Sequence, residues 1–271
     1  MDYQGKTAWV TGASSGIGEA LAHELSVRGA AVILSGRRVD ALQAVAARLA
    51  GPSLVLPFEA TDLEALPGVV ERALAWKGVD LLINNAGVTQ RSLALDTDFD
   101  VYRRLMEVDY FAPLRLTQLV LPRMVAQRSG HLSVVSSMAG KVGSPLRTGY
   151  SAAKHACVGY FESLRAEVEQ AYGVSVILPG AVATPITLSA LAGDGARHAQ
   201  SDPLIAAGMA PRRAAAIILD AIAEGRREIP VGSDVELEML RMRAHEPERL
   251  FEAMANLGAG LAAARGSGTG A

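Results

Sequence analysis

The chain alternates between short apolar runs and longer segments in which apolar residues recur every three or four positions. A short apolar run between turn residues is typical of a buried strand, and the longer period is typical of a helix. The predicted strands lie at 6–10, 31–35, 54–58, 79–83, 131–135, 174–178 and 227–231. The predicted helices cover 19–28, 39–49, 62–76, 111–128, the segment around Tyr150 and Lys154, and 211–224.

Because the strands are apolar almost throughout, both faces of the sheet should be covered. The alternation of strands and helices predicts an α/β fold, a doubly wound parallel sheet of about seven strands with helices on both faces. Ligands of such sheets bind beyond the carboxyl ends of the strands. Gly12, Asn84, Ser137 and Pro179 fall at those ends, so we expect one crevice to collect them.

The composition suits one large domain, although two domains are also possible. The 271 residues carry a formal net charge of −2, and 50% of them are hydrophobic and 20% charged, which fits a single well-buried core. We expect one domain over 1–257, including a mobile substrate lid at about 184–210 that mixes apolar residues with glycines. Residues 258–271 are expected to form a flexible tail.

Several classes of function are not expected. No basic arm or acidic tract indicates a nucleic-acid partner. Cys157 is the only cysteine, which indicates no disulfide framework, and the five histidines do not show the spacing of a metal site. No apolar run is long enough to span a bilayer, and the fold is expected to begin within the first ten residues, leaving no room for a secretory leader. A cytoplasmic location is therefore predicted.

A glycine-rich turn follows the first predicted strand. Residues 11–18 read T-G-A-S-S-G-I-G, a G-x-x-x-G-x-G spacing that differs from the G-x-G-x-x-G dinucleotide fingerprint. Unpaired backbone N–H groups at a helix start bind phosphate, and glycines let the backbone approach the anion closely. The turn fits the pyrophosphate of a dinucleotide, although a tight strand-to-helix connection without a ligand would have the same composition.

Ser137, Tyr150 and Lys154 are the candidate proton-transfer residues. Tyr150 and Lys154 are four positions apart, so on a helix they share one face, where an ammonium can stabilise a phenolate. Ser137, from another element, could then hydrogen-bond a substrate oxygen. On its own, the pair is better explained as a half-buried aromatic residue beside a solvated charge.

These motifs occur together with N-N-A-G at 84–87 and P-G at 179–180, all in one order along the chain. By these motifs and their order, the chain resembles the short-chain dehydrogenase/reductase family from about Gly5 to Thr184. The resemblance implies a Rossmann fold, a nicotinamide dinucleotide cofactor, interconversion of a carbonyl compound and its alcohol, and a homodimer or homotetramer. The stretch 121–167 is most similar to a branch that includes vertebrate reductases of lipophilic carbonyl compounds.

The resemblance also implies residue roles. Tyr150 would be the general acid in reduction or the base in oxidation, Lys154 would support it and bond the nicotinamide ribose, and Ser137 would hold the substrate oxygen. The implied cofactor-binding residues are Gly12, Ser14, Ser15, Gly16, Ile17, Gly18, Arg37, Arg38, Glu59, Ala60, Asn85, Ala86, Gly87, Tyr150, Lys154, Pro179, Gly180, Val182 and Thr184.

Arg37 and Arg38 favour NADP(H), with NAD(H) still possible. A site for NAD places an acid at the end of the second strand, whereas an Arg there accommodates the 2′-phosphate of NADP. No acid occurs in this segment before Asp40. The alternative is that the two arginines are a solvated helix start, although positive charge there opposes the helix dipole.

Two positions depart from the family pattern. Asp109 stands where the family usually has an Asn beside the catalytic Lys, and Glu59 stands where an Asp usually accepts from adenine. We include Asp109 in the predicted catalytic set. If ionised, it would favour the ammonium of Lys154 but oppose phenolate formation on Tyr150, so we expect activity whose base limb is moved to higher pH.

The sequence thus predicts an NADP(H)-dependent oxidoreductase acting on a small carbonyl compound, and the apolar residues of the lid favour a lipophilic one. The alternative from another class is a catalytically weak dinucleotide-binding regulator or scaffold, which Asp109 motivates. A sugar-nucleotide epimerase would share the Tyr and Lys pair, but it would usually show another glycine spacing and a longer substrate region.

Overall fold

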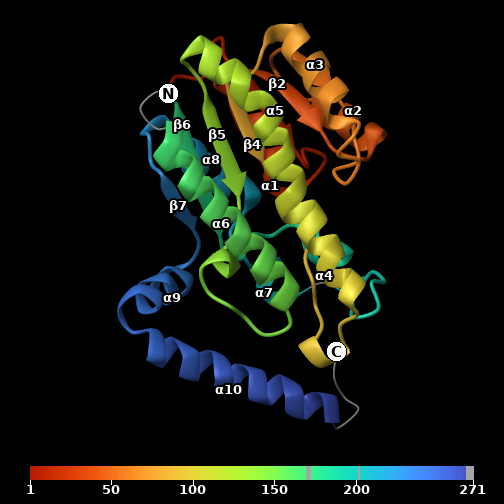
Figure 1. Ribbon diagram of the computed structural model, residues 1–271, viewed down its shortest axis with the longest axis vertical. Helices are drawn as coiled ribbons and strands as arrows, with labels where there is room; N and C mark the ends of the chain where they lie inside the picture. Colours follow the sequence, from red (N-terminus) through yellow and green to blue (C-terminus); the bar gives the residue numbers. More distant parts are fainter. Residues whose placement is uncertain (169–171, 201, 267–271) are drawn as a thin grey trace.

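The computed structural model describes residues 1–168, 172–200 and 202–266. One parallel sheet of seven strands forms its centre, in the order β3-β2-β1-β4-β5-β6-β7, which confirms the predicted doubly wound fold (Figure 1). The strands are β1 (Thr7–Thr11), β2 (Ala31–Ser35), β3 (Ser53–Val55), β4 (Leu81–Asn84), β5 (His131–Val135), β6 (Gly173–Pro179) and β7 (Glu228–Val231).

Helices cover both faces of the sheet. They are α1 (Gly16–Val27), α2 (Val39–Ala46), α3 (Leu66–Lys77), α4 (Phe99–Met106), α5 (Ala112–Gln127), α6 (Thr148–Val168), α7 (Pro203–Ala206), α8 (Pro211–Ala223), α9 (Asp234–His245) and α10 (Pro247–Gly266). Figure 1 shows α5 and α6 crossing one face. Neighbouring strand residues point into different cores, since Val10 packs with α1 and α8 and Trp9 packs with α3, α5 and α6. This two-sided burial explains the continuous apolar runs.

The topology places a ligand site between β1 and β4. The chain runs from β1 outward through β2 to β3 and then returns to β4 on the other side of β1. At such a switch point the loops after two neighbouring strands diverge and leave a crevice. The glycine turn after β1 and the Asn-rich turn after β4 meet there.

Some predicted boundaries were wrong. Helix α3 begins at Leu66 instead of 62, because Asp62 accepts a hydrogen bond from the Ala65 N–H in a separate turn before the helix. The segment before α5 was not assigned, yet it contains α4 and a π-helical turn, Glu107–Phe111. A single π turn of this kind often marks a functional site.

Part of the segment predicted as a flexible tail from residue 258 is helical, and its flexibility stays a prediction. Helix α10 continues through Gly266, and its last turns are rich in Ala and Leu, which are strong helix formers. Residues 267–271 of the predicted tail lie outside the described residues. A bilayer-crossing helix would need a longer apolar run than any helix in the described part of the chain provides.

Candidate active site

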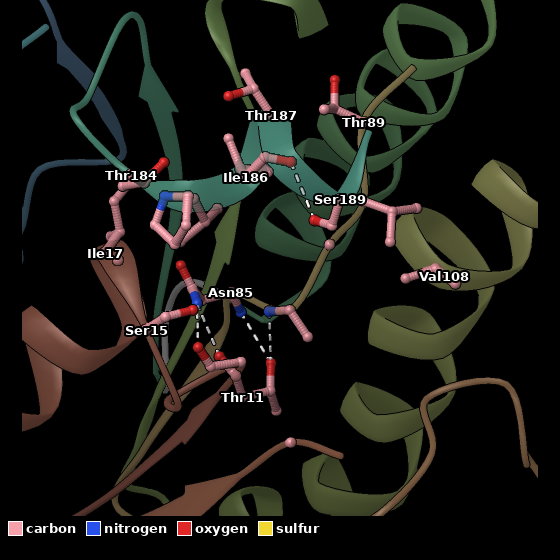
Figure 2. A pocket seen from close by; sticks show the side chains of 18 of the residues that line it. Thr11, Ser15, Ile17, Asn85, Thr89, Val108, Thr184, Ile186, Thr187 and Ser189 are labelled. Carbon is pink, nitrogen blue, oxygen red and sulfur yellow. Dashed lines mark hydrogen bonds between the residues drawn. The ribbon is translucent and has the colours of Figure 1, made fainter. Parts of the chain in front are cut away.

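A cavity of about 470 Å³ opens at the carboxyl ends of the central strands, and Figure 2 shows it from close by. All the predicted site residues line it except Gly18 and Asp109. The structure therefore brings together segments that are up to about 170 positions apart in the chain, as expected for the end of a parallel sheet. The individual roles of these residues stay predictions.

The glycine turn forms a cradle whose shape depends on missing side chains. Gly12 and Gly16 have φ angles of 66° and 60°, a region that favours glycine. A Cβ on Gly12 would lie 2.9 Å from the Ala86 Cα atom, and one on Gly16 would lie 3.0 Å from Thr184 Cγ2. The turn runs into the start of α1, so the backbone N–H groups at that helix end face a space that fits a pyrophosphate.

Gly18 has a packing role beside this cradle. A Cβ there would collide with the Gly12 carbonyl oxygen, so glycine at this position lets α1 lie close against the turn. This contact explains why Gly18 belongs to the motif without lining the cavity.

Thr11 holds the loops after β1 and β4 together, and sequence reasoning missed it. Its Oγ1 accepts from the N–H groups of Asn85 and Ala86 at 2.9 and 3.0 Å, and the Asn85 side chain donates to the Thr11 carbonyl at 2.9 Å (Figure 2). Asn84, which we expected in the crevice, instead points away and donates to Thr117 Oγ1 at 3.1 Å. Strand alternation is the signal that separates the two asparagines.

Helix α6 presents Tyr150 and Lys154 to the cavity. The Lys154 Nζ atom lies 5.6 Å from the centre of the Tyr150 ring and donates to the Val135 carbonyl at 3.1 Å. Ser136 points the other way from Ser137, and its hydroxyl donates to the Lys154 carbonyl at 3.0 Å. The lysine is thus held at both its backbone and its ammonium group.

Ser137 lies at the start of a 3₁₀ turn, Met138–Gly140, after β5. Its Oγ accepts from the Ala139 N–H at 3.1 Å and donates to the Pro179 carbonyl at 3.3 Å. The hydroxyl is therefore oriented by two backbone groups at the cavity wall, where it can also contact a substrate oxygen.

Asp109 lies behind the cavity wall, in the π-helical turn, and is buried. Its Oδ1 accepts from the Val88 N–H at 3.0 Å and lies 3.4 Å from Lys154 Nζ, while Oδ2 has no hydrogen-bond partner among the described residues. Gly87 makes room for this carboxylate, since a Cβ there would be 2.5 Å from Oδ1. Asp109 therefore contacts Lys154 and does not line the cavity.

In this pair, burial and the attraction between the two charges shift each pKa in opposite directions. Burial raises the pKa of Asp109, and the ammonium of Lys154 partly offsets the rise. For Lys154, burial alone would lower the pKa, but the neighbouring carboxylate of Asp109 and other groups raise it overall. Lys154 is therefore an ammonium at any physiological pH.

Cys157 lies next to this pair. Its thiol donates to the Asp109 carbonyl at 2.8 Å, and burial raises its pKa to about 12. The thiol therefore stays protonated and acts as a packing group behind the pair.

Arg37 and Arg38 lie past the end of β2 and are already partnered. Arg38 Nη2 donates to the hydroxyls of Ser14 and Ser15 at 3.1 and 3.2 Å. Arg37 Nη1 lies 3.7 Å from Glu59 Oε2. Arg104, from α4, lies 3.8 Å from the other Glu59 oxygen and also lines the cavity. Nothing in its sequence spacing pointed to Arg104, because its helix was not predicted.

The segment after β6 covers part of the cavity. A 3₁₀ turn, Pro185–Ser189, and Ile205 from α7 line it, within the lid predicted at 184–210. Asp202 holds this segment down, since its Oδ2 accepts from Arg91 at 2.7 Å and from Arg147 at 3.2 Å. In the described ranges, no group of three His, Cys, Asp or Glu side chains is arranged to hold a metal ion.

Comparisons with known proteins agree with this geometry. A family model described as short chain dehydrogenase matches residues 6–194. A "Dehydrogenase/reductase SDR family protein 7-like" from Anopheles gambiae is 40% identical over 83% of this chain and 74% of its own length. "Dehydrogenase/reductase SDR family member 7B" from Mus musculus is 38% identical over 91% of this chain and 79% of its own length.

Solved structures share the fold. A short chain dehydrogenase from Burkholderia cenocepacia, crystallised with NADP, superposes with a TM-score of 0.79 at 28% identity, covering 94% of this chain and 99% of that one. A short chain dehydrogenase/reductase from Burkholderia phymatum, crystallised with NAD, gives the same score at 24% identity over 92% and 96%. The chain described here belongs to the short-chain dehydrogenase/reductase family and is an NAD(P)-dependent oxidoreductase acting on CH–OH groups.

Proposed function

We propose that the protein uses NADP(H) to interconvert a lipophilic ketone or aldehyde and its alcohol. The observation that carries the proposal is one cavity lined by the glycine turn, by two arginines past β2, and by Ser137, Tyr150 and Lys154. A pure binding protein would gain little from placing a phenol, an ammonium and an oriented hydroxyl around the same space.

The residues present fit a dinucleotide. The cradle at Gly12 and Gly16 would hold the pyrophosphate, and Lys154 and Thr184 would hold the nicotinamide half. When bound, the nicotinamide supplies or accepts the hydride. Tyr150 would give its proton to the substrate oxygen during reduction, while Ser137 donates a hydrogen bond to that oxygen and stabilises the charge that develops on it.

The preference for NADP(H) rests on charge. Arg37 is half-exposed and pairs with Glu59 at 3.7 Å, so it can turn to a phosphate at small cost. Arg38 is already directed at the glycine turn by two serine hydroxyls. Guanidinium groups bind phosphate through paired donors, which favours a 2′-phosphate at this place.

The preference for a lipophilic substrate rests on the cavity wall. Ile186, Leu188 and Ile205 of the lid line it, and Arg147 and Arg197 line it too; apolar walls with a few polar groups are typical of small-molecule sites. Assembly as a homodimer or homotetramer stays a prediction, supported by the exposed apolar residues Phe111 and Val125 next to and on α5. The cytoplasmic location stays a prediction as well.

The first test is turnover. NADPH or NADH is incubated with a panel of lipophilic ketones and aldehydes, and loss of the reduced cofactor is followed by absorbance. We expect turnover that falls by at least about 100-fold in Tyr150→Phe, since acid–base catalysis contributes about that much. Tyr160→Phe, on the outer part of the same helix, serves as the matched control. Tight NADPH binding without turnover of any compound would favour the regulator or scaffold instead.

The second test separates the two cofactors. Each charge-assisted hydrogen bond to the phosphate is worth about 1.5–3 kcal/mol, so Arg37→Ala and Arg38→Ala should each weaken NADPH binding by about tenfold or more. NADH binding should not change, because it lacks the phosphate. Arg72→Ala, on the exposed face of α3, is the control. Equal loss of both cofactors in the Arg38 variant would mean that Arg38 supports the glycine turn instead.

A further inference from the structure

Gln90 is a fully buried amide between β4 and the lid, and neither the sequence motifs nor the proposed mechanism uses it. Its Oε1 accepts from the Gly149 N–H at 2.8 Å and from the Tyr150 N–H at 3.4 Å. These two donors belong to the first turn of α6, where backbone N–H groups have no partner within the helix. A side chain 59 positions earlier in the chain thus caps the helix at Tyr150 itself.

The other half of the amide fixes its orientation. Gln90 Nε2 donates to Ser92 Oγ and to Thr97 Oγ1, both at 3.1 Å. The Thr97 hydroxyl in turn donates to the Leu93 carbonyl at 2.7 Å. Because Oε1 faces two backbone N–H donors, a rotated amide would lose both of those contacts. Gln90 therefore holds α6 from one defined direction.

Gly149 allows this close approach. A Cβ at that position would lie 2.7 Å from Leu105 Cδ1, 2.8 Å from Tyr102 Cδ1 and 3.1 Å from Gln90 Oε1. The start of α6 is thus packed against α4 and Gln90 with no space for adjustment, and buried packing of this density transmits small displacements.

The backbone around Gln90 also contacts the lid. Gln90 pairs with Leu191 in an isolated bridge, in which Leu191 donates to the Thr89 carbonyl at 2.8 Å and Arg91 donates to the Leu191 carbonyl at 2.9 Å. Thr89 lines the cavity (Figure 2). One residue thus joins the cavity wall, the lid and the helix that carries the phenol.

We propose that Gln90 is a positioning residue that sets the place of the Tyr150 phenol through the first turn of α6. The inference rests on the proposed function, because it assigns Gln90 to the proton transfer by Tyr150. Loss of the amide would let the first turn of α6 shift, and a displacement of about 1 Å at a reacting group can cost about 100-fold in rate. Cofactor binding by the glycine turn would not change.

The test compares Gln90→Met with Gln90→Glu. Met keeps the length of the side chain but accepts neither N–H, so we expect kcat to fall by about 10- to 100-fold with the Kd of NADPH unchanged. Glu keeps an oxygen that accepts from both donors at a helix N-terminus, so it should retain more of kcat than Met does. Gln118→Met, on the exposed face of α5, is the control for the substitution itself.

The outcomes separate this inference from the proposed function. Wild-type turnover with an unchanged kcat in Gln90→Met would overturn the inference alone. Parallel loss of kcat and NADPH affinity in both variants would also overturn it, because Gln90 would then only support the fold. If the wild-type protein binds NADPH but reduces no carbonyl compound, both the proposed function and this inference are contradicted.

Discussion

Two ion pairs of similar length border the cofactor cavity, and burial is what separates them. Lys154 Nζ lies 3.4 Å from Asp109 Oδ1, and the side chains are 5% and 0% exposed. Arg37 Nη1 lies 3.7 Å from Glu59 Oε2, but these side chains are 54% and 40% exposed. The first pair stands behind Tyr150, and the second stands where a 2′-phosphate is expected.

The two environments make the pairs suitable for different tasks. Exposed ion pairs contribute about 0–1 kcal/mol, because water and salt screen them. Arg37 can therefore exchange Glu59 for a phosphate at little cost. A buried pair is different, since each charge has lost its hydration and depends on the other. Lys154 and Asp109 are expected to behave as one unit, in which a change at either residue alters the charge of the site.

The largest expected effect is on stability. Lys154→Met should lower the free energy of unfolding by about 3–5 kcal/mol, because it leaves the Asp109 carboxylate buried without its partner. Urea unfolding followed by circular dichroism measures this. Lys6→Met is the matched control, since Lys6 lies 3.6 Å from Asp80 in a pair that is 41% and 32% exposed, and it should cost no more than about 1 kcal/mol.

A second variant checks the cause of that loss. Replacing both partners, Lys154→Met with Asp109→Leu, should recover most of the stability, because no uncompensated charge then remains in the interior. If Lys154→Met lowers the free energy of unfolding no more than Lys6→Met does, burial does not distinguish the two kinds of ion pair. That result would contradict the comparison.

The strands could be predicted well because both faces of the sheet are buried. Each strand appears as an apolar run, and seven runs were found where seven strands lie. Helix α4 was missed for the opposite reason. Only Val101 and Leu105 are buried on it, which is a narrow stripe, and the π turn that follows shifts the apolar period before α5 begins.

Site residues that belong to a local sequence motif could be predicted, whereas residues placed by long-range tertiary contacts could not. The glycine turn, Tyr150 and Lys154 could be singled out from their local spacing, and they line the cavity. The roles of Thr11 and Gln90 were not predicted, since each accepts hydrogen bonds from backbone groups about 60 to 75 positions away. A hydrogen bond to a backbone amide leaves no pattern in the sequence of side chains. Arg104 was missed for another reason, because it reaches Glu59 from a helix that was not predicted.

The next effect concerns the pH dependence of activity. Burial raises the pKa of Asp109, with Lys154 opposing the rise, and an ionised carboxylate disfavours further negative charge in the site. Asp109→Asn removes that negative charge. The base limb of the kcat/KM profile should therefore move to lower pH, by about one pH unit. Steady-state rates with NADPH across the pH range measure the shift.

Asp100→Asn provides the control for this substitution, because it removes the same charge from an exposed position on α4. Its profile should coincide with that of the wild type, since exposed charges are screened. Coincident profiles for Asp109→Asn and the wild type would mean that Asp109 does not influence the proton transfer, and its role would be confined to holding Lys154.

The smallest effect tests the exposed pair. Glu59→Gln should change the free energy of unfolding by less than about 1 kcal/mol, because Glu59 is half-exposed and its two arginine contacts are 3.7 and 3.8 Å long. It should nevertheless tighten NADPH relative to NADH by a few-fold, since Arg37 no longer shares its charge with a carboxylate. Fluorescence titrations at low and high salt measure both affinities. The gain should shrink as salt is added, because screening weakens the phosphate contact. A variant that loses NADPH and NADH equally would show instead that Glu59 contacts the adenine, as its place after β3 suggests, and that Arg37 does not depend on it.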